Sequence, residues 1–313
     1  RNYIAYRIAN AMGAAGSMEW HPSGQHVELV MNGLHRGNYF LCEQIKIDNN
    51  RVKGVEFDDE IHTPDVTNQI SYLLEGDRNW GDNNTGDSEE TLYWESYRQQ
   101  TKEWKESSNG TYVYGTRYLN SDNHNSYSDG TGYRFRWGLK SPDDGDLGSG
   151  SAGKATASFD FIKTKVEDAE KYFFGGGFTE TTSLNDINSY INLDSFIEYW
   201  LVYEIAMNQE PNNPGSCYMH YYNVDQKIYM GPVWDFDYGS FLTSDQFNDD
   251  GRYKDKHEHF QNANALWYCR LLQNVNVQDY IISNWPKYRA AALGVANQMD
   301  SIKEYLKPSA QMN

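Results

Sequence analysis

Apolar and polar residues alternate along much of the first half of the chain, as β-strands require. Residues 26–47 (HVELVMNGLHRGNYFLCEQIKI) alternate on both sides of Asn32-Gly33, a dipeptide that strongly favours a tight hairpin turn. Shorter strand patterns follow at Ile70–Glu75 and at Gly132–Pro142. The pattern therefore predicts an antiparallel hairpin and further strands in this half of the chain.

Apolar residues recur at intervals of three or four elsewhere, which is the spacing of an amphipathic helix. This spacing predicts helices over residues 1–13 and 155–174, each of which ends at glycine. Residues 194–208 (DSFIEYWLVYEIAMN) predict another helix, capped by Asp194 and apolar enough to lie at the centre of a core. The segment from Ala265 to Leu306 is also mainly helical in its pattern.

Strand patterns therefore dominate the first half of the chain and helical patterns the second, which predicts an α+β protein with two lobes. We expect a β-rich lobe over residues 1–150. A mainly helical lobe over residues 151–313 would also carry a hairpin around residues 224–227. Residues 77–131 are polar and rich in Asn, Gly, Ser and Tyr, so we expect an insertion of strands and long loops there. Loops of this length often carry function.

The net charge restricts the classes of partner. The 313 residues hold 27 Lys and Arg against 44 Asp and Glu, which gives a formal charge of −17. Nucleic-acid binding is disfavoured because phosphate contacts require clustered basic side chains. No run approaches the ~20 apolar residues of a membrane span, and the chain does not open on the basic and apolar stretches of a secretion signal. We therefore expect a soluble mature protein.

Two aspartates in residues 231–239 (GPVWDFDYG) form the sharpest candidate site. If the segment is extended, side chains alternate, so Asp235 and Asp237 share one face while Trp234 and Phe236 share the other. Paired carboxylates supply the oxygen ligands that Mg²⁺ prefers when phosphate and water complete its coordination. A solvated acidic turn is the alternative that the pattern alone leaves open.

A polar loop precedes this acidic segment. The central helix leads into Asn208, Glu210, Asn212 and Asn213, and a hairpin of about twenty residues separates this loop from Asp235. The order of polar loop, hairpin and acidic segment is similar to the catalytic and metal loops of protein kinases. In that layout the first carboxylate orients or deprotonates the acceptor hydroxyl, while the amide and the second carboxylate hold the metal. The Gly-rich loop and V-A-I-K motif of those kinases are absent from the sequence.

The same segments resemble a known family. In chain order, the resemblance rests on RNYIAYRIANAMG, VELVMNGLHRGNYFLCEQI, YLLEGDR, LKSPDD and EYWLVYEIAMNQEPNNPGSCYMHYYNVDQKIYMGPVWDFDYG. Over about residues 1–240 the chain resembles the spore coat protein H (CotH) kinase family. Members of this family have an atypical kinase-like fold and bind ATP with Mg²⁺, and some phosphorylate Ser residues of partner proteins. The resemblance therefore implies a two-lobed kinase-like fold with ATP and Mg²⁺ as cofactors.

The resemblance also implies roles for particular residues. Asp235 and Asp237 would bind Mg²⁺, and Asn213 or its neighbour Asn212 would add an amide ligand. Glu210 would be the catalytic carboxylate, acting together with Asp235. Active relatives typically carry Asp at the place of Glu210. Because Glu moves the carboxylate one methylene further out, we expect weakened turnover with metal binding retained.

Four residues are candidates for binding the nucleotide. Glu43 and Glu75 each end an apolar strand pattern, where an unpaired carboxylate is costly, so each is expected to meet a cation such as Lys140 or Arg78. The resemblance implies that Lys140 contacts phosphates while a glutamate orients it, and a purely structural ion pair is the alternative. Trp234 would stack on adenine or, alternatively, pack in the core.

The first functional hypothesis is thus a protein kinase that transfers phosphate from Mg-ATP to Ser or Thr of a partner protein, or a nucleotide-binding relative with weakened turnover. The acidic charge favours a basic acceptor. The composition, together with the secreted and surface members of the family, predicts an extracytoplasmic bacterial protein.

Two alternatives stay open. A non-catalytic surface module would bind glycans or proteins through the aromatic-rich loops of residues 77–131, since aromatic residues make up 15% of the chain. A glycosidase would use Glu210 with Asp235 or Asp237 as its acid and base. The sequence contains no H-E-x-x-H or G-x-S-x-G motif, which disfavours a zinc enzyme and a serine hydrolase.

Overall fold

A computed structural model of the chain describes most of the residues outside the polar insertion. The described residues are 1–18, 20–77, 92–97, 105–106, 112–113, 136–143, 145–148, 156–212, 214–237, 239–241, 260, 262–263 and 265–312. Most of the insertion expected over residues 77–131 therefore lies outside the described residues. Its assignment as loops and short strands stays a prediction.

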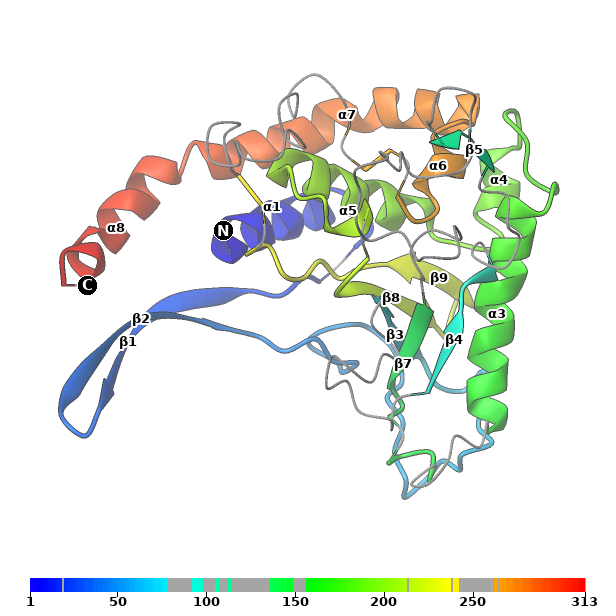
Figure 1. The fold of residues 1–313 in the computed structure, drawn as a ribbon, viewed down its shortest axis with the longest axis horizontal. Coiled ribbons are helices and arrows are strands. Elements are labelled where there is room, and N and C mark those ends of the chain that lie inside the picture. The colour runs from blue at the N-terminus through cyan, green and yellow to red at the C-terminus, as the bar shows by residue number, and fades with distance from the viewer. Residues whose placement is uncertain are drawn as a thin grey trace.

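One antiparallel sheet organises the fold, and its five strands come from both halves of the chain (Figure 1). The strand order is β4-β7-β3-β8-β9, with bounds β3 Tyr72–Asp77, β4 Tyr93–Glu95, β7 Arg136–Ser141, β8 Cys217–Tyr222 and β9 Lys227–Met230. Strand β3 is central, and its Glu75 lies opposite Gly138 of β7 on one side and Tyr218 of β8 on the other. A separate pair, β5 (Lys105–Glu106) and β6 (Tyr112–Val113), forms a second small sheet.

The α+β class is confirmed, since helices and antiparallel strands are both present and most strands precede the long helices. Strands β8 and β9 were expected in the helical lobe, but β8 pairs with β3 and β9 with β8, in the same sheet as β4 and β7. The kinase-like arrangement of two lobes and the boundary near residue 150 stay predictions.

The central helix is α5 (Leu193–Ala206), and its apolar sequence explains its position. It is apolar on nearly every side, and most of its residues are buried. Asn192, and not Asp194 as expected, caps its first turn by accepting a hydrogen bond from the backbone nitrogen of Ser195 (2.9 Å). The helix ends at Met207, which adopts a left-handed conformation (φ 54°). The cap prediction was therefore wrong by two residues, while the helix itself is confirmed.

The other helices surround α5 and the sheet. Helix α1 (Asn2–Ala15) runs two residues beyond the predicted end at Gly13 and packs against α5 and α7 (Val275–Ala296). Helix α3 stands beside the edge of the sheet that β4 forms (Figure 1). The remaining bounds are α3 Ala157–Phe174, α4 Leu184–Ile187, α6 Tyr268–Leu271 and α8 Met299–Met312. Among the described residues, no helix combines the length and apolarity that a membrane crossing demands.

A fully buried carboxylate joins α3 to the sheet. Glu170 accepts hydrogen bonds from the Ser96 hydroxyl (2.6 Å), the Tyr97 backbone nitrogen (2.6 Å), and the indole nitrogens of Trp137 (3.0 Å) and Trp267 (3.2 Å). Burial raises the pKa of Glu170, and these four donors oppose that effect. Because the donors come from three distant parts of the chain, the carboxylate fixes how α3, the sheet and the segment before α6 meet.

A second buried carboxylate joins α5 to the end of α1. Glu198 accepts hydrogen bonds from the backbone nitrogens of Ser17 (2.8 Å) and Met18 (3.0 Å) and from the Tyr288 hydroxyl (3.2 Å). Burial outweighs these donors and raises the pKa of Glu198 to about 7, with a further contribution from the charge of Asp194. This carboxyl therefore titrates near neutrality in the folded protein.

The hairpin predicted around Asn32-Gly33 is confirmed. Strands β1 (Gly24–Met31) and β2 (Leu34–Cys42) form a two-stranded sheet of their own, and both turn residues have positive φ (51° and 75°), as a tight hairpin turn requires. The hairpin projects away from the five-stranded sheet toward the side where α8 ends (Figure 1). It is therefore attached to the rest of the protein mainly at its base and by the helices near it.

Candidate functional site

The acidic segment after β9 is a loop and not the extended strand end that the alternation predicts. Asp235 adopts a left-handed conformation (φ 57°), which interrupts the alternation at this residue. The side chains of Asp235 and Asp237 nevertheless meet and share a hydrogen bond. Burial, together with this hydrogen bond and the charge of Asp237, raises the pKa of Asp235 to about 6. The predicted pair is present, although its geometry differs from the prediction.

Helices α1 and α5 hold this loop in place. The backbone nitrogen of Phe236 donates to the Asn2 side chain (2.6 Å), and the Arg1 guanidinium donates to the backbone oxygen of Asp237. The Tyr203 hydroxyl of α5 donates to the backbone oxygen of Trp234 (2.8 Å). Phe236 is fully buried beneath the loop. These anchors leave Asp237 exposed and Asp235 partly exposed, while Phe236 between them points inward.

Asn208 connects the polar loop to the acidic loop. Its amide nitrogen donates to the Asp235 backbone oxygen (3.4 Å) and to the Ser240 hydroxyl (2.9 Å), and its amide oxygen accepts from the Glu210 backbone nitrogen (2.7 Å). Its own backbone oxygen accepts from the Asn262 amide (2.8 Å), and the residue is fully buried. Asn208 therefore positions both loops, a role that the sequence did not reveal.

Glu210 opens a short 3₁₀ helix, Glu210–Asn212, directly after Asn208. It is partly buried, and its negative charge contributes, after burial, to raising the pKa values of Cys217 and Tyr203. The Glu210 carboxylate thus affects the pKa values of one group at the start of β8 and one in α5. Asn213, the predicted amide ligand, lies outside the described residues, so its role stays a prediction.

Lys140 and Glu75 form the ion pair that the sequence predicts, with Nζ 3.4 Å from Oε2. Burial raises the pKa of Glu75, and the nearby ammonium group of Lys140 opposes this. The Tyr218 hydroxyl also bonds to Glu75, and burial followed by the charges of Glu75, Asp235 and Asp77 raises the pKa of Tyr218. The pKa of Tyr218 thus depends on the carboxylates of both β3 and the acidic loop. Tyr218 was not among the residues predicted from the sequence. The other candidate cation, Arg78, is outside the described residues.

Glu43 and Trp234 have contacts that favour structural roles. The Glu43 carboxylate accepts from the backbone nitrogen (2.9 Å) and hydroxyl (2.6 Å) of Ser23, which closes the base of the β1–β2 hairpin. Trp234 is partly buried and stacks on Tyr6 with ring centroids 5.9 Å apart. One face of the indole is therefore taken by α1. Nucleotide binding by either residue stays a prediction.

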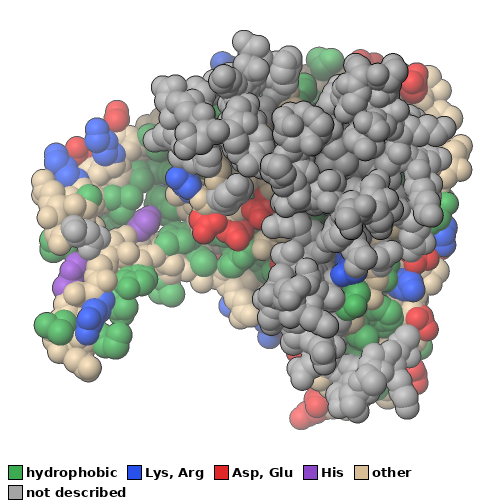
Figure 2. Space-filling model, in the orientation of Figure 1, with side chains coloured by type: hydrophobic (Ala, Val, Ile, Leu, Met, Phe, Trp, Pro, Cys, Tyr) green, Lys and Arg blue, Asp and Glu red, His purple; other side chains and the backbone are tan. Residues whose placement is uncertain are grey.

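The acidic loop suits a hard cation that other groups help to coordinate. Acidic side chains gather near the middle of the face shown in Figure 2, beside residues that are not described. Within the described ranges, no three His, Cys, Asp or Glu side chains converge as a metal site would need. Mg²⁺ commonly uses only one or two carboxylates and completes its shell with water and phosphate oxygens. Asp235 and Asp237 fit that role, because a cation between them would oppose the burial and the charge of Asp237 that raise the Asp235 pKa.

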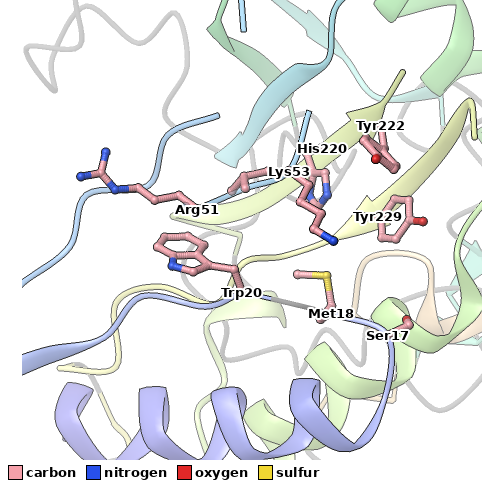
Figure 3. A pocket seen from close by; sticks show the side chains of 9 residues that line it. Ser17, Met18, Trp20, Arg51, Lys53, His220, Tyr222 and Tyr229 are labelled. Atoms are coloured by element: carbon pink, nitrogen blue, oxygen red, sulfur yellow. The ribbon is translucent and has the colours of Figure 1, made fainter. Parts of the chain in front are cut away.

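A separate cavity of about 110 Å³ lies near β8 and β9 and includes none of the predicted site residues. Figure 3 shows the side chain of Lys53 in this cavity beside His220 and Tyr229, whose rings stack 5.0 Å apart. Burial lowers the pKa of His220 to about 4, so its ring is neutral at pH 7. Trp20 of this cavity, like Tyr218 and Trp234 of the candidate site, packs on the small cluster of Ile45, Ile47, Val52 and Leu73. The cavity and the candidate site thus share one apolar boundary.

The fold and site together define an α+β protein with a paired-aspartate loop fixed to a neighbouring carboxylate-bearing loop. Comparison with protein-family models matches the CotH kinase protein family over residues 154–313, which is just over half of the chain. The chain therefore belongs to the CotH kinase family. The match includes Glu210, Asp235 and Asp237 and begins after Lys140. A comparison with curated protein sequences gave no match.

Proposed function

We propose that this protein is a kinase-like phosphotransferase that binds ATP with Mg²⁺ and transfers phosphate to a Ser or Thr hydroxyl of a partner protein. The observation that carries the proposal is the Asp235–Asp237 pair, hydrogen-bonded side chain to side chain within the segment that matches the CotH kinase family. Phosphoryl transfer depends mostly on positioning and on neutralising charge, and two carboxylates on an anchored loop suit both.

The two aspartates would hold the metal ion. Mg²⁺, when bound, would neutralise charge on the phosphates, and Asp235 and Asp237 would keep it beside the loop that carries Glu210. The hydrogen bonds of Asn208 support this placement because they join the two loops through Asp235 and Glu210. Asn208 acts here as a positioning residue, and its amide is engaged with Asp235, Ser240 and Glu210.

Glu210 would accept the proton of the acceptor hydroxyl or orient that hydroxyl. Its carboxylate extends one methylene further than the aspartate that is typical of active relatives. A displacement near 1 Å can cost ~100-fold in rate. We therefore expect Glu210→Asp to raise the transfer rate and Glu210→Gln to abolish transfer, with nucleotide affinity changed little in both variants.

Lys140 would contact the phosphates while Glu75 keeps its ammonium group in position. The chain as a whole repels nucleotides with its charge of −17, so an ATP site requires a local cation. Lys140 is about one-third exposed at the end of β7 and can reach a ligand without leaving Glu75, which is itself nearly buried. The same overall charge favours a basic acceptor protein.

The test compares Asp235→Asn and Asp237→Asn with Asp279→Asn, an exposed residue of α7 whose substitution removes the same charge. Calorimetry measures ATP affinity with Mg²⁺ and with EDTA, and transfer of labelled phosphate is measured on mixed basic protein acceptors. We expect the two loop variants to lose transfer and to bind Mg-ATP at least ~10-fold more weakly, equivalent to about 1.4 kcal/mol. If they behave like the α7 variant, or if the native protein binds no nucleotide, the proposal is wrong.

An extracytoplasmic location and a bacterial source belong to this proposal as expectations drawn from the family. The alternative of a glycan- or protein-binding surface module depends on residues 77–131, most of which lie outside the described residues. It therefore stays a prediction from the sequence.

A further inference from the structure

One face of the β1–β2 hairpin exposes a row of large apolar side chains. Strand register places Met31 opposite Leu34, and residues 27 and 25 opposite Tyr39 and Leu41, so all of these lie on the same face as Leu29. The five side chains of Leu29, Met31, Leu34, Tyr39 and Leu41 are between 38% and 60% exposed. We call these five residues the hairpin face. Figure 2 shows hydrophobic side chains gathered over the projecting hairpin.

The opposite face of the hairpin is partly in use, although Val30 near the turn is 61% exposed. His26 and Phe40 pack their rings against Tyr3 of α1 (centroids 5.4 and 6.0 Å away). Further out, Asn38 donates to the Ser309 hydroxyl of α8 (3.3 Å), and Ser309 donates to Glu28. Helices α1 and α8 thus support the hairpin from behind and leave the hairpin face turned away from them.

Such a surface is unusual for a chain of this composition. The mean hydropathy of the protein is −0.80, yet its hairpin carries contiguous apolar side chains in solvent. Contiguous exposed apolar patches of this kind mark interaction surfaces. The hairpin face therefore has the character of an interface and not of a solvated surface.

We infer that two copies of this chain associate through their hairpin faces. The five side chains carry no charge, so two molecules of charge −17 can meet there without placing like charges in contact. The acidic chain as a whole attracts basic partners, but these five residues include no acidic group that would bind one. A two-fold axis sets the same patch against itself, and stacked β-ribbons pack face to face ~10 Å apart.

The size of the patch limits the area of the interface that it can form. Five large side chains exposed by about half present on the order of 500 Å². Pairing two such patches buries about 1,000 Å², which is the lower limit for a specific interface. An interface at this limit is typical of weak and transient association, so we expect a reversible dimer. This inference does not depend on the proposed phosphotransfer, because none of the five residues belongs to the candidate site.

Sedimentation equilibrium of the full chain, from about 5 to 500 μM, tests the inference. Leu34→Lys and Leu41→Lys each place a charge in the hairpin face. The matched control is Ile61→Lys, which adds the same charge at an exposed apolar residue outside the hairpin (74% exposed). We expect each hairpin variant to weaken dimerisation at least ~10-fold and the control to change it less than about twofold. Far-UV circular dichroism establishes that all variants remain folded.

Two results would overturn the inference. The first is a monomer across the whole concentration range, which would leave the face to a different partner. The second is a native dimer that the hairpin variants leave unchanged.

Discussion

Replacing Glu198 with glutamine should change how the stability of the protein depends on pH. The substitution removes a buried carboxyl on α5 that accepts hydrogen bonds from Ser17, Met18 and Tyr288. Burial raises the pKa of this group from 4.5 to about 7. The folded state therefore binds more protons than the unfolded state between these two pH values.

The contribution of Glu198 to the free energy of unfolding is fully present below pH 4.5 and is lost as the pH rises to about 7. At about 1.4 kcal/mol for each pH unit, the total is on the order of 3 kcal/mol. Glutamine does not titrate, so the variant lacks this pH-dependent contribution.

Two buried histidines act in the opposite direction. Burial lowers the pKa of His21 to about 3 and that of His220 to about 4, so both rings stay neutral when the folded protein is acidified below pH 6.5. The unfolded chain takes up these protons instead, and stability falls. In the native protein Glu198 offsets part of this loss, whereas in Glu198→Gln the loss is uncompensated.

Urea denaturation followed by tryptophan fluorescence at half-unit steps from pH 5 to pH 7.5 measures both proteins. The native chain should gain stability relative to the variant by about 2 to 3 kcal/mol between pH 7 and pH 5. Glu304→Gln, an exposed residue of α8, serves as the control and should track the native protein. A stability difference between native and Glu198→Gln that is constant over this range would refute the reasoning.

Two further substitutions test the buried hydrogen bonds. Glu170→Ala removes the buried acceptor that the indole nitrogens of Trp137 and Trp267 share. The substitution should lower the free energy of unfolding by more than about 4 kcal/mol in urea titration. A loss below about 1 kcal/mol would show that the network contributes little. Asn208→Ala removes two donors and one acceptor at a fully buried position, and should cost about 2 to 4 kcal/mol in the same assay, with Asn276→Ala on α7 as the partly exposed comparison.

Local signals in the sequence were sufficient for several elements. The turn at Asn32-Gly33 needs positive φ at both residues, and this dipeptide provides it at low cost, so the first hairpin could be predicted. The continuous apolar run of α5 likewise requires burial. The paired aspartates could be found because two carboxylates separated by one residue stay close in several backbone conformations.

Long-range contacts explain what the sequence did not show. The left-handed conformation of Asp235 accompanies the anchoring of this loop by α1 and α5, and alternation alone gives no sign of it. Tyr218 reaches Glu75 only because β3 and β8, more than a hundred residues apart in the chain, are paired. Glu170 has the pattern of an exposed helix residue until Trp137 and Trp267 approach it from other segments. Each case depends on pairing that no local window contains.

The position of β3 between β7 and β8 has a consequence for how the protein is made. Its two neighbours lie about 60 and 140 residues further along the chain, so most contacts of the sheet have high sequence separation. Closing such loops slows folding, and the ribosome must release β8 before the central strand can be paired on both sides. During synthesis β3 therefore keeps an unpaired edge until β8 emerges, and chaperones that shield such edges should raise the yield of folded protein.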